Sequence, residues 1–194
     1  MASNFGKTIQ VSTFGASHGY AIGGIVEGLP CGHSIDIDEL QAFLKRRAPG
    51  QNQLQTQRKE ADIPEFLAGM VDGMLSGSPL AFMIRNTSQH SGDYNNLRDI
   101  PRPSHADFTA RMRYGDKVDM RGGGHFSARL TAPLCVAGGI ALQLLREKGI
   151  EIHGHLKQVG TIQDTPIDMV HPNMKALSEI ATEPIAMVDA DKRN

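Results

Sequence analysis

The chain has 194 residues, of which 40% are hydrophobic and 21% charged, and its formal net charge at pH 7 is −1. This composition is typical of an ordinary globular protein, and a charge near zero argues against a general nucleic-acid or membrane-surface binder. The first residues lack the layout of a signal peptide, and the two cysteines show no metal-cluster spacing. We therefore expect a soluble, cytoplasmic protein that binds no metal, nucleic acid or membrane.

The N-terminal residues predict two strands with a short loop between them. Apolar and polar residues alternate over Thr8–Phe14, which is typical of a half-buried strand. The loop Gly15-Ala16-Ser17-His18-Gly19 has a glycine at each end. After it, Ile22–Leu29 is predicted to return as a second strand.

A helix and a polar loop are predicted next. Asp36 or Asp38 can cap the helix, which then runs to about Arg47. The sequence Ala48-Pro49-Gly50 stops it, because the residue before a proline is disfavoured in the helical conformation. Residues 51–59 have no apolar period and are expected to form a loop.

A hairpin and a long polar segment follow. Phe66–Met74 and Leu80–Ile84 are predicted strands, joined by the turn Ser76-Gly77-Ser78-Pro79. The polar stretch from Arg85 to Arg102 is too long for a plain connector, so we expect it to be functional or mobile. Ser104 can then cap a short helix from His105 to about Arg113.

Residues 121–129 read Arg-Gly-Gly-Gly-His-Phe-Ser-Ala-Arg and lead into the uncharged run Leu130–Leu145. That run predicts a buried helix ending at Gly149, with its start capped by Ser127 or Thr131. Three glycines let a ligand approach the backbone, and a helix N-terminus attracts anions. The stretch therefore predicts an anion site, although a tight surface turn with incidental charges explains the same residues.

The C-terminal residues contain one more predicted strand and an abrupt end. Ile150–Val159 alternates and is predicted to be a strand. The residues from Asp189 onward resemble a helix cap and first turn. We expect a chain truncated at this point, and a disordered tail is the alternative.

Charged and titratable residues gather in the middle of the chain. Ten of the twelve arginines lie between Arg46 and Arg129, and arginine suits phosphate and carboxylate recognition. His18, His105 and His125 lie in loops, where a histidine can exchange protons near neutral pH. Each histidine alone is also explained as an ordinary surface or hydrogen-bonded residue. Together these residues predict an anion-binding site with enzymatic chemistry.

Two other site hypotheses are weaker. Ser17-His18 could be a nucleophile and its base, but adjacent residues seldom face each other in a turn, and no nucleophile-elbow motif is present. His153 and His155 could form a metal pair on one strand face. No third ligand is evident near them, so a solvent-facing strand edge explains them equally well.

Several spaced motifs resemble those of the chorismate synthase family, in the same order along the chain. They are Phe14-Gly-Ala-Ser-His-Gly19, Arg46-Arg-Ala-Pro-Gly50, Thr56-x-Arg-x-Glu-x-Asp62, Arg102-Pro-Ser-His-Ala-Asp107, and Tyr114-Gly…Arg121-Gly-Gly-Gly…Ser127-Ala-Arg129. The resemblance implies an α+β fold of the β-α-β sandwich type, with helices packed between antiparallel sheets, and a homotetramer at full length.

The resemblance also implies a reaction, the last common step of the shikimate pathway for aromatic amino acids. In it, the phosphorylated small molecule 5-enolpyruvylshikimate 3-phosphate loses phosphate and its C6 proton in an anti-1,4-elimination that yields chorismate. The family requires reduced FMN, although the reaction has no net redox change. Whether the protein reduces its flavin with NADPH or receives it reduced is left open.

Ten residues match family positions with implied roles. His18 matches a histidine placed near the reduced flavin, and His105 matches the one thought to protonate the departing phosphate. The residues implied to contact the cofactor are Arg47, His125, Phe126 and Ser127. The residues implied to face the substrate are Ser17, Arg46, Arg121 and Arg129.

This chain departs from the family pattern in residues and in length. The residue departures are Ala16 in place of Glu, Ala48 and Gln53 in place of Arg, Ser104 in place of Gly, His125 in place of Arg and Leu130 in place of Glu. They leave the role of His125 open.

Family members are nearly twice as long as this chain. Residues 1–194 are therefore expected to be the N-terminal part of a single domain whose C-terminal half is missing, with little or no activity alone. A non-catalytic flavin- or anion-binding module is the alternative function, and a serine hydrolase using Ser17 is a third.

Overall fold

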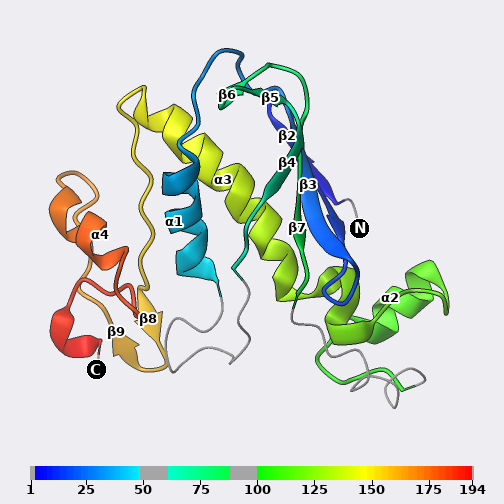
Figure 1. Cartoon of the computed structure of the whole chain (residues 1–194). Coiled ribbons are helices and arrows are strands. Elements are labelled where there is room, and N and C mark those ends of the chain that lie inside the picture. Colours follow the sequence, from blue (N-terminus) through cyan, green and yellow to red (C-terminus); the bar gives the residue numbers. More distant parts are fainter. Residues whose placement is uncertain (1–2, 49–60, 88–99, 194) are drawn as a thin grey trace. The chain divides into compact units, whose positions relative to one another are not determined.

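The computed structural model describes residues 3–48, 61–87 and 100–193 (Figure 1). The chain divides into two compact units, Met1–Leu144 and Leu145–Asn194. The expected loop at 51–59, and the part of the polar stretch between 88 and 99, lie outside the described residues. The single-domain interpretation stays a prediction.

The first unit is built on a five-stranded sheet in which every neighbouring pair is antiparallel. In spatial order its strands are β1 (Asn4–Gly6), β2 (Gln10–Gly15), β3 (Ala21–Glu27), β7 (Leu80–Arg85) and β4 (Glu65–Ala68). The strands predicted at Thr8–Phe14, Ile22–Leu29 and Leu80–Ile84 are thereby confirmed to within two residues at each end.

One face of this sheet is the core face. Val11, Val26 and Leu80 lie side by side in register on β2, β3 and β7, and all three are buried. Their neighbours in sequence point to the other face, because side chains alternate along a strand. On β2, the alternation that predicted the strand therefore also placed Val11 on the buried face.

The hairpin predicted between Phe66 and Ile84 is right in its pairing, because β4 pairs antiparallel with β7, but the predicted strand Phe66–Met74 is interrupted by a second hairpin. Two short strands, β5 (Met70–Val71) and β6 (Met74–Leu75), pair with each other through a turn at Asp72 and Gly73. Both turn residues have positive φ, 49° and 77°, as a two-residue type I′ hairpin requires. The Asp-Gly pair at 72–73 therefore indicated the position of the tight hairpin turn better than the Ser-Gly-Ser-Pro stretch at 76–79.

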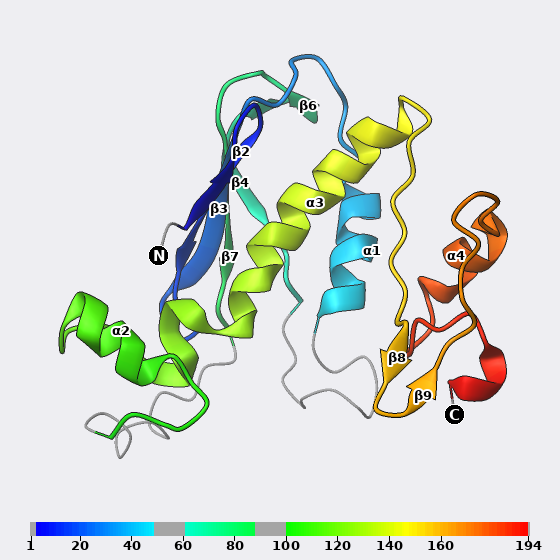
Figure 2. The same cartoon turned by 180° about the vertical axis from the view of Figure 1, so that it is seen from behind.

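Two helices cover the core face of the sheet, α1 (Ile37–Arg47) and α3 (Thr131–Arg146), as Figures 1 and 2 show. Asp36 caps α1 by accepting a hydrogen bond from the Glu39 N–H at 2.9 Å, which confirms the first of the two predicted caps. Gly139 of α3 leaves room for α1, because a Cβ there would lie 2.5 Å from Leu40 Cδ1. The arrangement is the predicted α+β class, with antiparallel strands.

The short helix α2 (Asp107–Tyr114) starts later than predicted. Its N-cap is Ala106, without a side-chain cap, and Ser104 has a φ of 61° that is incompatible with the predicted capping role. The first turn is held instead by Asp107, whose carboxylate accepts the main-chain N–H and the guanidinium of Arg102. The Arg102 guanidinium lowers the pKa of Asp107 below its ordinary value. His105 consequently lies before the helix and not in it.

The glycine stretch forms two short 3-10 turns ahead of α3, at Arg121–Phe126 and Ala128–Leu130. Ser127 caps the second turn by accepting the Arg129 N–H at 3.3 Å, and α3 itself begins at Thr131 with Pro133 in its first turn. A proline is tolerated in the first turn because the N–H groups there have no intrahelical acceptor. Ser127 is therefore a cap as predicted, although of the preceding turn, whereas Thr131 begins α3 without capping it, because its hydroxyl donates to the Ala128 carbonyl.

The segment Arg121–Arg146 is long and apolar enough, by length and composition alone, to cross a membrane. Of its most apolar window, 56% is buried inside the structure, and non-helical φ/ψ values interrupt it at its three glycines. Both features are those of a core helix, and such helices pass the same test of length and composition.

The second unit is mostly irregular. It contains a hairpin of β8 (Gln158–Val159) and β9 (Ile162–Gln163), the helix α4 (Met174–Ile180) and a 3-10 turn at Ala190–Lys192. The strand predicted over Ile150–Val159 is wrong except for its last two residues. Ile150 and Ile152 are exposed and no strand ladder forms there, because alternation alone supplies no hydrogen-bonding partner.

Both predicted turns at the edges of this unit are confirmed. Gly149 has a φ of 69°, and the N–H groups of Gly149 and Ile150 donate to Arg146 and Leu145, which closes α3 in a Schellman motif. Asp189 caps the 3-10 turn at Ala190–Lys192 by accepting the Asp191 N–H.

Candidate active site

The predicted site begins at the turn between β2 and β3. The Gly19 N–H donates to the Ala16 carbonyl at 2.9 Å, which closes the turn around Ser17 and His18. Ser17 is 1% exposed and His18 is 3% exposed. Both predicted site residues are therefore interior groups, held at the end of a strand pair.

The glycine stretch is docked onto this turn by Ser17. The Ser17 hydroxyl is within hydrogen-bonding distance of two carbonyl oxygens, those of Arg121 at 3.1 Å and Gly122 at 3.0 Å. The Ser17 main-chain N–H donates to the Gly124 carbonyl at 3.1 Å. Two segments more than 100 residues apart are thus joined through one side chain and its own backbone. A hydroxyl aimed at carbonyl oxygens is not an activated nucleophile, which disfavours the serine hydrolase alternative.

The three glycines serve different purposes. A Cβ at Gly122 would lie 2.3 Å from the His18 ring, and one at Gly124 would lie 1.8 Å from the Asp119 carbonyl oxygen. At Gly123 the added atom would meet only Ser127 Cβ, at 3.5 Å. Gly122 and Gly124 are therefore needed for packing within the protein. The prediction that glycines admit a ligand applies to Gly123, which lines a pocket.

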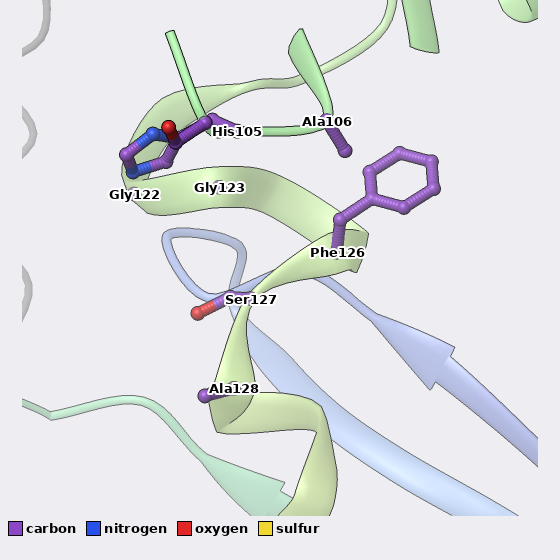
Figure 3. Close-up of a pocket in the computed structure, with 8 residues that line it drawn as sticks. His105, Ala106, Gly122, Gly123, Phe126, Ser127 and Ala128 are labelled. Atoms are coloured by element: carbon purple, nitrogen blue, oxygen red, sulfur yellow. The ribbon is translucent and has the colours of Figure 1, made fainter. Parts of the chain in front are cut away.

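That pocket has a volume of ≈ 300 Å³ and lies between the glycine stretch and the start of α2 (Figure 3). Its lining residues are Ser104, His105, Ala106, Gly122, Gly123, Phe126, Ser127 and Ala128. In Figure 3 the His105 ring lies beside Gly122, and the Phe126 ring lies beside Ala106. Three of the residues predicted from the sequence, His105, Phe126 and Ser127, thus share one wall.

His105 is exposed, and its ring is oriented by one hydrogen bond. The Nδ1 atom lies 2.9 Å from the Pro103 carbonyl oxygen. A carbonyl oxygen only accepts, so Nδ1 carries the proton of that bond and Nε2 is the nitrogen able to take up or release a proton. An imidazole held in this way can act as a general acid when protonated.

His125 is tied to the protein by both ring nitrogens. Nδ1 donates to the Gly15 carbonyl at 2.8 Å, and Nε2 lies 2.8 Å from the Ser3 hydroxyl. The ring also meets the edge of Phe126, with 6.1 Å between centroids. His125 does not line the pocket. The structure therefore places its imidazole against β2 and the N-terminal segment, and its predicted contact with a cofactor stays a prediction.

A buried ionic cluster joins two of the predicted arginines. The side chain of Asp62 is fully buried and accepts hydrogen bonds from both Arg47 and Arg129. The Arg47 Nη2 lies 2.7 Å from Asp62 Oδ2, and Asp62 itself has a φ of 48°. A non-glycine residue in that region costs free energy, and such strain is concentrated at functional sites. Arg47 and Arg129 thus lie in one site, as predicted, because both pair with the carboxylate of Asp62.

Asn86 extends this cluster to the Ser17–His18 turn. Its carbonyl oxygen accepts the Arg129 Nε–H at 3.2 Å, and its amide nitrogen donates to the carbonyls of Ala16 and Gly19 at 3.0 and 2.8 Å. A single side chain therefore connects one predicted substrate-binding residue with the turn that carries a predicted catalytic one.

The other two predicted arginines have separate contacts. The Arg46 guanidinium lies 5.5 Å from the centroid of the Phe43 ring on its own helix. Arg121 forms a two-pronged ion pair with Asp119, and this pairing lowers the pKa of Asp119 and raises that of Arg121. Neither lines the pocket. Their predicted role in substrate binding stays a prediction.

Sequence reasoning missed Asp62 and Asn86 as site residues. Asp62 closes the Thr56–Asp62 motif, so a signal was present without a role attached to it. Asn86 is the second residue of a long polar stretch and carries no comparable signal. Only the folded chain shows that both contact Arg129.

Across the described ranges, no group of three or more His, Cys, Asp or Glu residues could hold a metal ion. The His153 Nε2 lies 2.9 Å from Glu151 Oε2, which gives that histidine a partner other than a metal. Cys31 and Cys135 are both free thiols, and burial raises the pKa of Cys135.

Comparison with known proteins points to one family. A family model described as chorismate synthase matches residues 9–193. The chorismate synthase of Lancefieldella parvula is 45% identical over 184 residues, which are 94% of this chain and 48% of that protein. The chorismate synthase of Bacteroides thetaiotaomicron is 45% identical over 179 residues, 89% of this chain and 50% of that protein.

The fold agrees with these matches. A protein whose solved structure is titled "Crystal Structure of Chorismate Synthase" superposes with a TM-score of 0.67 at 22% identity, covering 96% of this chain and 50% of the other. The predicted fold class is confirmed, in the incomplete form expected. The chain spans about half the length of the curated relatives that it matches.

Proposed function

Because this chain belongs to the chorismate synthase family, we propose that it is the N-terminal portion of a chorismate synthase, a carbon–oxygen lyase acting on a phosphate ester. The reaction would be the anti-1,4-elimination of phosphate from 5-enolpyruvylshikimate 3-phosphate to give chorismate. The observation that carries this proposal is the joining of His18, the glycine stretch and the His105 pocket in one place.

The proposed acid is His105. Phosphate leaves with the electron pair of the broken carbon–oxygen bond, and protonation of that leaving group lowers the barrier to its departure. His105 lines the pocket with Nδ1 bonded to a carbonyl, so Nε2 is the atom that would deliver the proton. A different proton, the one on C6, is lost from the substrate, and the two electrons of the broken C6–H bond stay in the ring, which gains one double bond.

The proposed anion contacts are the arginines. Arg47 and Arg129 lie on the two sides of Asp62, and their orientation is set before any ligand arrives. Ser17, Arg46 and Arg121 complete the proposed substrate-facing set, and Ser127, on the pocket wall, is proposed to contact the cofactor.

The residues present fit part of an FMN site. Phe126, on the pocket wall, has a tilted partner in Tyr114 at 6.3 Å between centroids, and Gly123 leaves the backbone accessible beside it. An aromatic ring and exposed amides suit a flat heterocycle. A volume of ≈ 300 Å³ is at the lower end for small-molecule sites, so these residues would hold one portion of the cofactor. Reduced FMN would lend electron density as phosphate departs.

The wider properties belong to the same proposal. We propose a cytoplasmic homotetramer at full length, with NADPH as the candidate reductant of the flavin. The alternative is a non-catalytic fragment that keeps flavin or anion binding. It predicts FMN binding without phosphate release.

One assay separates these functions. Phosphate release from 5-enolpyruvylshikimate 3-phosphate would be measured anaerobically with reduced FMN, on residues 1–194 and on the product of the whole reading frame. We expect release from the whole product and little or none from residues 1–194. His105→Ala should abolish release while FMN binding stays largely intact. Absence of release from the whole product would contradict the proposed activity, and turnover by residues 1–194 would contradict the proposed incompleteness.

A further inference from the structure

Asn86 uses its main-chain N–H and both polar atoms of its side chain in hydrogen bonds at the base of the candidate site. It is 8% exposed, follows the last residue of β7, and its main-chain N–H donates to the Tyr20 carbonyl at 3.2 Å. Its side chain bonds to Ala16, Gly19 and Arg129.

The orientation of the Asn86 amide follows from its partners. Ala16 and Gly19 present carbonyl oxygens, which only accept, so the two hydrogens of the Asn86 NH₂ group must face them. The amide oxygen is then directed at the Nε–H of Arg129, at 3.2 Å. Only a side chain with two donors on one atom and an acceptor beside them satisfies all three partners.

The two carbonyls bracket the catalytic candidate. Ala16 and Gly19 lie on either side of Ser17 and His18, so the amide fixes both ends of the turn at once. Gly122 is packed against the His18 ring, where a Cβ would lie 2.3 Å from the ring. The turn that carries the imidazole is therefore held by the Asn86 amide together with its own Gly19–Ala16 hydrogen bond.

We propose that Asn86 is a positioning residue, which holds the His18 turn in register with Arg129. This inference rests on the proposed chorismate synthase function, because it assigns His18 and Arg129 their roles. The Asn86 amide does not line the pocket. It acts through the two residues that it connects.

Asn86→Asp separates the two connections. A carboxylate has the same shape and still accepts from Arg129, but it offers no donor to Ala16 and Gly19 and repels both carbonyl oxygens. The turn is expected to shift while Arg129 keeps its partner. A misplacement of about 1 Å at a reacting group costs on the order of 10²-fold in rate. We expect kcat to fall by about that factor, with KM nearly unchanged.

Asn173→Asp is the matched control. Asn173 caps α4 by accepting the Ala176 N–H, and aspartate caps a helix equally well. The control makes the same chemical change far from the candidate site in the sequence. We expect its kcat, KM and melting temperature to match those of the unchanged protein.

Two measurements test the proposal. The first is kcat and KM for phosphate release by the whole reading-frame product, well below the melting temperature of each variant. The second is the NMR titration of the His18 imidazole in the 194-residue chain, which needs no substrate. Asn86→Asp should lower kcat. Asn86→Ala, which adds no charge near the imidazole, should move the His18 titration, whereas a purely stabilising role would change only the melting temperature.

The outcomes are distinguishable. An Asn86→Asp protein with the kcat and His18 titration of the Asn173→Asp control overturns the positioning role. If the unchanged protein releases no phosphate, the proposed function fails, and the His18 titration still decides the position of the turn. If Asn86→Asp does not fold, Asn86→Ala removes both donors without adding charge. It should show the same loss of kcat, and an Ala variant with unchanged kcat overturns the proposal.

Discussion

Two buried aspartates, one in each compact unit, differ in the groups that compensate their charge. Asp62 in the first unit is 2% exposed and accepts hydrogen bonds from the side chains of two arginines. Asp164 in the second unit is 7% exposed and accepts from three main-chain N–H groups, of Thr165, Val188 and Asp189.

The difference lies in what each carboxylate holds in place. A buried charge must be compensated, and either arginines or amides can do it. Arginine partners leave two cationic side chains oriented toward each other, which is useful at a site for anions. Amide partners leave only a fixed backbone, here the bend that brings residues 188–189 to 164–165. A ligand site is therefore indicated at Asp62 and not at Asp164.

Removing the charge of Asp62 should have the largest effect. In Asp62→Asn the buried guanidinium of Arg129 loses its carboxylate, and loss of one partner of a buried ion pair costs about 3–5 kcal/mol. Urea unfolding followed by circular dichroism measures the loss. Asp116→Asn, the same change at an exposed position of the same unit, is the control and should be nearly neutral. Equal stability of the two variants would show that the cluster is not essential for the first unit.

A side chain at Gly122 should have the next largest effect. Gly122→Ala places a methyl group 2.3 Å from the His18 ring at a φ of 58°, so we expect a loss of about 2–4 kcal/mol from overpacking and backbone strain. Gly138→Ala is the control, because no atom lies within 4 Å of an added Cβ and alanine favours a helix. Thermal unfolding should show a lower melting temperature for the first and an equal or higher one for the second. The reverse order would mean that the glycine stretch does not pack on His18.

Asp164 should matter less, and its effect should depend on pH. Burial raises the pKa of Asp164, but the N–H groups of Asp189, Val188 and Thr165 outweigh it, so the folded pKa lies below the ordinary value. Its stabilisation is therefore complete above the unfolded pKa of about 3.9 and is lost as pH falls through the folded pKa. Asp164→Asn should cost about 1–3 kcal/mol at neutral pH.

Hydrogen exchange of the Val188 and Asp189 amides measures the stabilisation by the Asp164 carboxylate at the residues that it holds. Protection in the unchanged protein should decline on acidification below about pH 4. In Asp164→Asn it should be low throughout and depend less on pH. A pH profile identical in both proteins would remove Asp164 as the group responsible.

The exposed pair of Arg121 and Asp119 should have the smallest effect. The Arg121 side chain is 47% exposed, and exposed ion pairs contribute at most about 1 kcal/mol. Arg121→Ala should therefore change stability by less than about 1 kcal/mol, and less at high salt. Urea unfolding at two salt concentrations tests this. If substrate binding weakens in Arg121→Ala while stability is unchanged, the role predicted for Arg121 from the family motif gains support.

Regular elements with a local pattern could be predicted from the sequence. The strand β2 follows from alternation, β3 and β7 were predicted from their strand-like sequences, and α1 follows from its Asp36 cap and apolar face. The capped turn at Asp189 and the end of the helix at Gly149 could also be predicted from local sequence patterns. Each depends on residues within a few positions of one another.

Predictions failed where a distant partner decides the structure. Alternation over Ile150–Val159 describes a strand, yet only Gln158 and Val159 have a strand partner. A strand ladder needs a second segment, and a local pattern does not contain it. The Ser104 cap failed for a local reason: Asp107 pairs with Arg102, five residues before it, and the helix starts later.

The sequence by itself determined the strands β2, β3 and β7 and the helices α1 and α3 of the first unit, and its spaced motifs were enough to identify the family. Only the tertiary structure decided that Gly122 packs against His18, that Asp62 joins Arg47 to Arg129, and that Asn86 connects Arg129 to the His18 turn. Periodicity is a property of neighbouring residues, set by local backbone geometry. The contacts that build the site join residues from 15 to more than 100 positions apart, so they exist only once the sheet and helices have brought those segments together.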